Sequence, residues 1–101
     1  TLSGNRLLEV GVGIHGMVLA SPGDDGHADN LKITGNKFKD TLGMGTNAIL
    51  IETVENLPKR AFLLDAMIKG NSITHFTTAL IPNAALPPYI TGAFGPQSIH
   101  P

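Results

Sequence analysis

The sequence predicts an all-β fold in which short strands recur along the chain. Two series of repeats lead to this prediction. The first series has an aliphatic residue, any residue, Gly, Asn, any residue and an apolar residue, at Leu2–Leu7, Ile33–Phe38 and Ile68–Ile73. The second series consists of short apolar runs between these copies, at Met17–Leu19, Ile49–Ile51 and Ala79–Ile81. Two patterns that recur in the same order indicate stacked repeats.

The composition limits the classes of protein that fit. A chain of 101 residues supports one domain, and a hydrophobic content of 42% argues against disorder. Seven Lys and Arg against eight Asp and Glu give no basic surface, so neither nucleic acid nor an anionic membrane is an expected partner. The chain has no cysteine, which excludes disulfides and thiolate zinc sites. We expect no cofactor and no metal.

Each copy of the first series predicts a strand, a tight turn and a second strand. Glycine adopts positive φ without steric cost, and asparagine tolerates it better than most residues. The asparagines Asn5, Asn36 and Asn71 are then expected to lie above one another and to form a ladder of hydrogen-bonded side-chain amides. This ladder is a structural role that needs no ligand.

The second series and the residues that precede each Gly-Asn turn supply the expected interior. Side chains alternate along a strand, so one face of each run points inward. From the second series we expect an inward row of Met17, Leu19, Ile49, Ile51, Ala79 and Ile81. From the strands around the turns we expect Leu31, Ile33, Phe38, Ala66, Ile68 and Ile73. A short helix over residues 56–67 is a weaker alternative for that segment.

The C-terminal part of the chain differs in composition. Residues 1–81 carry the repeats, with a degenerate fourth copy at Ile90–Phe94, whereas residues 82–101 hold five prolines. Since proline cannot donate to a sheet, we expect an irregular extension that caps the repeats or reaches a neighbouring subunit. Three coils alone are few for a stable stack, so we also expect a longer parent chain, an oligomer such as a trimer, or both.

The alternation resembles the right-handed parallel β-helix of the pectin-lyase-like superfamily. The Gly-Asn turns, the paired apolar positions Leu31/Ile33 and Ala66/Ile68, and the runs 48–51 and 78–81 carry the resemblance over residues 2–94. It implies about three coils, each with short strands in three parallel sheets. Leucine-rich repeats are a competing solenoid, but spacings of 31 and 35 residues between the asparagines exceed the usual 20–29 of that family.

Loops beside the second series hold the candidate site residues. We expect loops at Ala20–Asn30, Lys39–Asn47 and Thr53–Asp65. The first contains the candidate catalytic residues Asp24, Asp25 and His27, because paired carboxylates can act as acid and base in glycoside hydrolysis. A Ca²⁺ site or a solvated turn would use the same residues. Candidate substrate-binding residues are Glu52, Glu55, Lys59 and Arg60, with weak surface ion pairs as the alternative.

The resemblance implies a class of function. Its members include phage tailspikes and secreted enzymes that bind and process polysaccharide, so the expected partner is a polysaccharide and the expected location is extracellular or on a virion surface. Tyr89 is the only tyrosine and tryptophan is absent, which leaves few aromatic platforms for a sugar. A non-catalytic structural or receptor-binding module of a virion appendage or adhesin is therefore the alternative, and whether the chain is an enzyme is left open.

Overall fold

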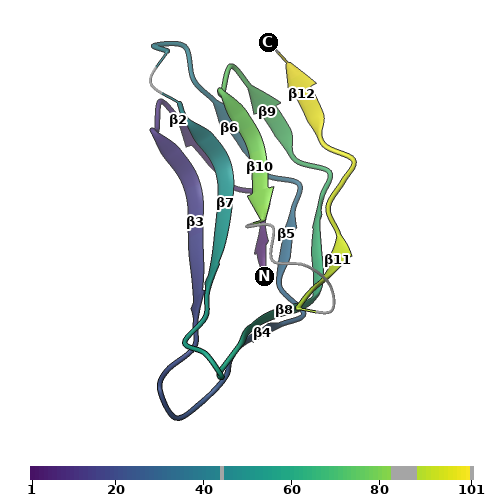
Figure 1. Ribbon diagram of the computed structural model, residues 1–101. Coiled ribbons are helices and arrows are strands. Elements are labelled where there is room, and N and C mark those ends of the chain that lie inside the picture. The colour runs from purple at the N-terminus through teal and green to yellow at the C-terminus, as the bar shows by residue number, and fades with distance from the viewer. Residues whose placement is uncertain (44, 83–88, 101) are drawn as a thin grey trace.

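The computed structural model describes residues 1–43, 45–82 and 89–100, with the backbone alone for residues 81 and 82. All regular structure in this part is β, in three sheets of parallel strands (Figure 1). The first sheet has the order β1 (Leu2–Ser3), β5 (Lys32–Thr34), β8 (Ala61–Lys69) and β11 (Ile90–Ala93), and β4 (Gly26–Asp29) also pairs with β8. The second has the order β2 (Arg6–Leu8), β6 (Lys37–Lys39), β9 (Ser72–Thr74) and β12 (Ser98–His100). The third has the order β3 (Val12–Leu19), β7 (Asn47–Val54) and β10 (Thr78–Pro82).

The chain visits the three sheets in a fixed rotation. Strands β1, β2 and β3 belong to the first, second and third sheets, and the chain then returns to the first sheet at β4 and β5. The same rotation follows through β6, β7 and β8, and again through β9, β10 and β11. We call one passage of the chain through the three sheets a circuit. Equivalent strands of successive circuits lie side by side and pair in parallel.

The Gly-Asn turns connect the first sheet to the second. Gly4, Gly35 and Gly70 have φ of 66°, 66° and 70°, which explains why glycine occupies this position in each copy. The asparagines that follow are stacked: Asn5 Nδ2 donates to Asn36 Oδ1 at 3.0 Å, and Asn36 Nδ2 donates to Asn71 Oδ1 at 3.0 Å. The predicted amide ladder is present.

The core lies between the three sheets. Its fully buried residues include Ile33, Phe38, Ile49, Leu63, Ile68 and Ile73. The six interior positions predicted from the strands around the turns all belong to this core or pack against it.

The predicted orientation of Met17 and Leu19 is wrong. Both side chains are exposed, by 51% and 58%, whereas Val18 between them is only 7% exposed. The reason is the strand register. Ile14 and Leu80, and not Met17 and Ala79, are the neighbours of buried Ile49. Ala79 still packs against the core, and the side chain of Ile81 is outside the described part of the chain.

The stretch predicted as an irregular extension contains regular structure. Strand β11 pairs with β8 and β12 pairs with β9, so residues beyond 82 add strands to the first and second sheets. The Ile90–Phe94 motif is not the fourth turn. Gln97 stands at the turn instead, where its Oε1 accepts hydrogen bonds from Asn71 N at 3.1 Å and Asn71 Nδ2 at 2.9 Å. The sequence pattern missed this copy because it has glutamine where the other copies have asparagine.

The alternative helix over 56–67 does not form, because β8 begins at Ala61 and an isolated antiparallel bridge joins Asn56 to Lys59. Within the described ranges there is no helix with the length and apolar character needed to cross a membrane.

Candidate functional site

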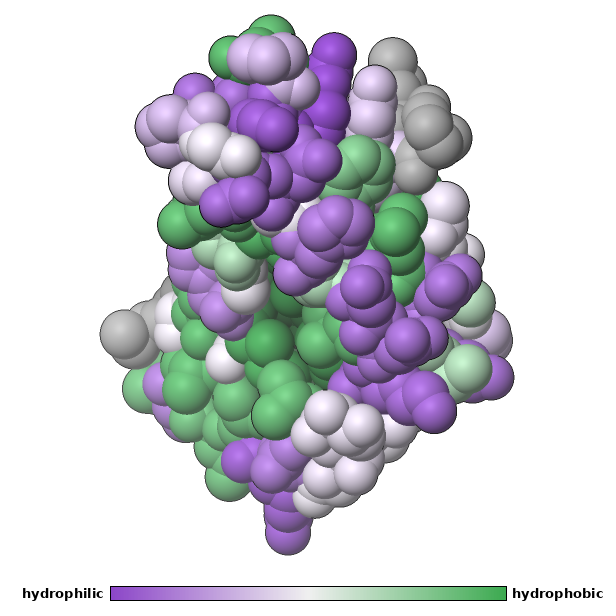
Figure 2. All heavy atoms as spheres, turned by 90° about the horizontal axis from the view of Figure 1, so that it is seen from below, coloured by the Kyte–Doolittle hydropathy of each residue, from purple (hydrophilic) through white to green (hydrophobic). Residues whose placement is uncertain are grey.

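Most of the predicted site residues lie where β3 and β7 end and the chain enters the first sheet, at the bottom of Figure 1. The loops are shorter than predicted, since Gly26–Asp29 forms β4 and Ala61–Lys69 forms β8, and these two strands pair in parallel. From below, apolar residues gather in one area bordered by hydrophilic residues (Figure 2).

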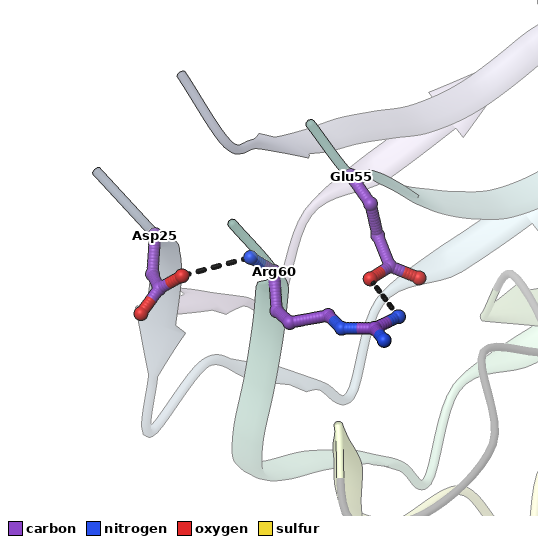
Figure 3. A network of polar contacts seen from close by, with 3 residues as sticks. All are labelled: Asp25, Glu55 and Arg60. Carbon is purple, nitrogen blue, oxygen red and sulfur yellow. Dashed lines mark hydrogen bonds and ion pairs between the residues drawn. The ribbon is translucent and has the colours of Figure 1, made fainter. Parts of the chain in front are cut away.

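The two predicted catalytic aspartates have different surroundings. Asp24 closes a turn with Ser21: Ser21 N donates to Asp24 O at 2.9 Å, and Asp24 N donates to Ser21 Oγ at 3.0 Å. The carboxylate of Asp25 faces the start of β8, where its Oδ1 accepts a hydrogen bond from Arg60 N at 2.8 Å (Figure 3). Asp25 therefore fixes the entry of two adjacent strands into the sheet.

Arg60 and Glu55, two predicted substrate-binding residues, form an ion pair. Arg60 Nη1 donates to Glu55 Oε2 at 2.6 Å, and the two side chains are 38% and 29% exposed (Figure 3). The hydrogen bond to Glu55 raises the pKa of the Arg60 guanidinium, so this group stays charged. Lys59 lies in the same turn, where its backbone exchanges hydrogen bonds with Asn56 at 2.9 and 3.0 Å.

Three aromatic rings, from β4, from β8 and from Tyr89 just before β11, form a row beside this ion pair. His27 stacks on Phe62 with ring centroids 4.9 Å apart and planes 16° apart, and Phe62 meets Tyr89 edge to face at 5.6 Å. The guanidinium carbon of Arg60 lies 5.0 Å from the centre of the Tyr89 ring. We call His27, Phe62 and Tyr89 the aromatic row.

The aromatic row lies on the outer face of the first sheet. His27 pairs in register with Phe62, and Phe62 stands between buried Ala61 and buried Leu63 in β8. Its side chain therefore points away from the core. The His27 ring is half exposed, and its Nδ1 is 3.7 Å from Asp29 Oδ1. The row is thus an accessible apolar strip with charged groups next to it.

Glu52 is separated from the other predicted binding residues. It lies on β7 of the third sheet, where its Oε2 is 2.7 Å from His15 Nε2 on β3. This pair is exposed, at 47% for His15 and 37% for Glu52. The prediction had both Glu52 and Glu55 follow a strand that ends at Ile51, whereas β7 runs on to Val54 and includes Glu52.

Phe62 and Tyr89 were absent from the predicted site. Sequence reasoning could have found Phe62 only by predicting that part of the Ala20–Asn30 loop is a strand, because that strand, β4, pairs with β8 and places His27 beside Phe62. Among the described residues, no group of three or more His, Asp or Glu side chains is placed to hold a metal ion. What the arrangement offers chemically is apolar ring surface, one guanidinium and several carboxylates, a set suited to binding a polar ligand with apolar faces.

Comparison of the chain with protein-family models, curated proteins and solved structures found no match.

Proposed function

We propose that this chain is a polysaccharide-binding module built as a right-handed parallel β-helix. The fixed rotation of the chain through three parallel sheets supports the β-helix part of this proposal. The Asn5–Asn36–Asn71–Gln97 amide ladder supports it as well, because it joins every circuit at the same corner. The resemblance to the pectin-lyase-like superfamily suggests a phage tailspike-like or secreted parent, on a virion surface or outside the cell, that is trimeric or longer than this chain.

The observation that carries the binding function is the aromatic row. Pyranose rings present faces of C–H groups that pack on aromatic rings, while their hydroxyls need hydrogen-bond partners at the edge. The row supplies three rings in succession, with Arg60 lying against Tyr89 and Glu55 and Asp25 close by. A row along the stack suits an extended polymer whose successive sugars contact successive strands.

Binding without cleavage is the form of this function that the local contacts favour. The carboxylate of Asp25 accepts a backbone N–H, and Asp24 belongs to a closed turn with Ser21. The Asp25 carboxylate therefore has a structural role, whereas Asp24 contributes only backbone atoms to its turn. The engaged carboxylate of Asp25 supports the alternative of a non-catalytic receptor-binding module.

Binding is tested by affinity electrophoresis in gels that contain a panel of neutral and acidic polysaccharides. Phe62→Ala and Tyr89→Ala should abolish the retardation that at least one polysaccharide causes. The matched control is Phe76→Leu, at a ring that packs edge to face on Phe38 at 6.3 Å, away from the row. Retardation that survives in both row variants, or no retardation of the natural chain by any polysaccharide, would contradict the proposal.

Cleavage is tested separately with the same polysaccharides. Reducing ends and the absorbance of unsaturated products are followed for the natural chain and for the double variant Asp24→Asn/Asp25→Asn. Background signal from both is the expected result. Product formation that the double variant lacks would assign catalysis to these aspartates and overturn the non-catalytic form of the proposal.

A further inference from the structure

The charges around the aromatic row bear on the class of polysaccharide that it binds. They belong to residues 24–29, which lead into and form β4, and to residues 55–62, which lead into and begin β8. With histidine neutral, two cations against four carboxylates give these segments a net charge of −2, from Lys59 and Arg60 and from Asp24, Asp25, Asp29 and Glu55. The surroundings of the row are therefore negative.

Arg60, the cation that contacts the row, is already paired. Its guanidinium carbon lies 5.0 Å from the centre of the Tyr89 ring, while its Nη1 donates to Glu55 Oε2 at 2.6 Å. A carboxylate or sulfate group of a ligand at this point would compete with Glu55, which is held near Arg60 by the chain itself. Such an anion would gain little from Arg60 and would be repelled by Glu55.

Asp29 adds a carboxylate at the His27 end of the row. The two residues lie two positions apart on β4, so their side chains point to the same face of the sheet. Asp29 Oδ1 is 3.7 Å from His27 Nδ1, and the side chain of Asp29 is 55% exposed. An anionic group that reaches the His27 ring therefore comes close to a like charge, which disfavours its binding.

Carboxylates at the edge of the row suit hydroxyl groups instead. An ionised carboxylate accepts hydrogen bonds with both oxygens, and each sugar hydroxyl brings one donor. Asp25 and Glu55 each direct one oxygen to Arg60, to its backbone N and to its Nη1, while their second oxygens point away from these contacts (Figure 3). Hydrogen bonds to a charged acceptor are stronger than those between neutral groups.

We propose that the aromatic row takes an uncharged polysaccharide and discriminates against chains that carry carboxylate or sulfate groups. The rings pack on the C–H faces of the sugars, and the outward oxygens of Asp25 and Glu55 accept hydrogen bonds from the hydroxyls. This inference rests on the proposed function, because it concerns the same site. It can fail while binding stands, since the same rings would then hold an acidic polysaccharide.

The test compares polysaccharides that share a backbone and differ in charge. Hydroxyethyl-cellulose with carboxymethyl-cellulose, and dextran with carboxymethyl-dextran, are two such pairs. Any other neutral polysaccharide that retards the chain is paired with its form oxidised at C6, and any acidic one with its carboxyl-reduced form. Affinity electrophoresis at pH 8, where histidine is ordinarily neutral, gives a dissociation constant for each member.

The uncharged member of a retarding pair should bind at least about fivefold more tightly at low salt. Equal or tighter binding of the charged member would overturn the inference and leave the proposed function standing, provided that Phe62→Ala abolishes it. Retardation by no polysaccharide, or retardation that survives Phe62→Ala, would overturn both.

Substitution of Asp29 separates local charge from the charge of the whole chain. Asp29→Asn should reduce the ratio of the two dissociation constants by about twofold, and Asp29→Lys by about threefold or more. Leu42→Lys is the control for net charge, at a leucine that is 68% exposed in the loop after β6, and it should leave the ratio unchanged. Circular dichroism confirms the fold of each variant, and Asp29→Asn alone decides if Asp29→Lys does not fold. An Asp29 variant with the natural ratio would contradict the inference.

Salt provides an independent readout. Raising the ionic strength from about 0.01 M to about 1 M shortens the screening length from about 30 Å to about 3 Å. The ratio of the two dissociation constants should then fall toward one, while binding of the uncharged member stays the same. A ratio that does not respond to salt would mean that shape and not charge excludes the charged member, and the inference would be wrong.

Discussion

Asn36 donates its side-chain amide to Oδ1 of Asn71, 35 residues later in the chain, at 3.0 Å, and both residues are buried. Oδ1 of Asn71 also accepts the backbone N–H of Asn36 at 2.9 Å. One side-chain oxygen thus satisfies two donors from the neighbouring circuit. The ladder connects circuits at a point where the turn leaves backbone groups without sheet partners, which makes it a structural element in its own right.

Asn71→Ala is expected to destabilise the chain by about 2–4 kcal/mol, because it leaves buried donors of Asn36 and the carbonyl of Ile33 without partners. Urea unfolding followed by circular dichroism measures this change. Asn5→Ala is the control: it removes one side-chain donor at the exposed end of the ladder, and the expected loss is below about 1 kcal/mol. Equal losses for the two variants would show that burial of the ladder contributes nothing.

Gly70→Ala tests the backbone of the turns. Its φ is +70°, and a Cβ added there would meet no atom closer than Gly35 N at 4.0 Å. Any cost therefore comes from the left-handed conformation and not from a clash, and it should be about 1–2 kcal/mol. Gly23→Ala is the matched control, because its Cβ would meet nothing within 4 Å and its φ is not in the left-handed region. A Gly70→Ala variant as stable as the Gly23→Ala variant would refute this account.

The sequence was informative where a turn required particular residues. Glycine and asparagine recur at each corner because the corner needs positive φ and a stacking amide, so the ladder and the strands beside it could be predicted. The register of the third sheet could not be predicted. Met17, Val18 and Leu19 are all apolar, so the alternation of side chains does not show which face of the strand is buried. The fourth corner was missed because Gln97 replaces asparagine and the preceding residues are Gly95 and Pro96.

The candidate site was predicted only in part for a related reason. Glu55 and Arg60 lie five residues apart on one turn, so their pairing is local and accessible to sequence reasoning. The aromatic row joins residues 35 and 27 positions apart, from His27 to Phe62 and from Phe62 to Tyr89. Such a row depends on the length of every loop between the strands, and nothing in the residues themselves fixes those lengths.

Substitutions at neighbouring positions of β3 test the corrected register. Val18→Asp places a carboxylate at a site that is 7% exposed and should cost more than about 3 kcal/mol or prevent folding, because burial removes the water that solvates the charge. Leu19→Asp, at a site that is 58% exposed, should cost less than about 1 kcal/mol. Urea midpoints of the two variants decide between the registers, because the register with Met17 and Leu19 inward requires the opposite order.

Asp25 provides the final prediction, because its structural role depends on an oxygen and a catalytic role would depend on a charge. Its Oδ1 accepts Arg60 N at the point where β8 begins. Asp25→Asn keeps a side-chain oxygen that can accept this hydrogen bond, so it should change stability by less than about 0.5 kcal/mol and leave polysaccharide retardation intact. Asp25→Ala removes the acceptor and should cost about 1 kcal/mol, with weaker retardation, because the entry of β8 also positions Phe62. If Asp25→Asn were as damaging as Asp25→Ala, the negative charge and not the hydrogen bond would be the property that the site requires.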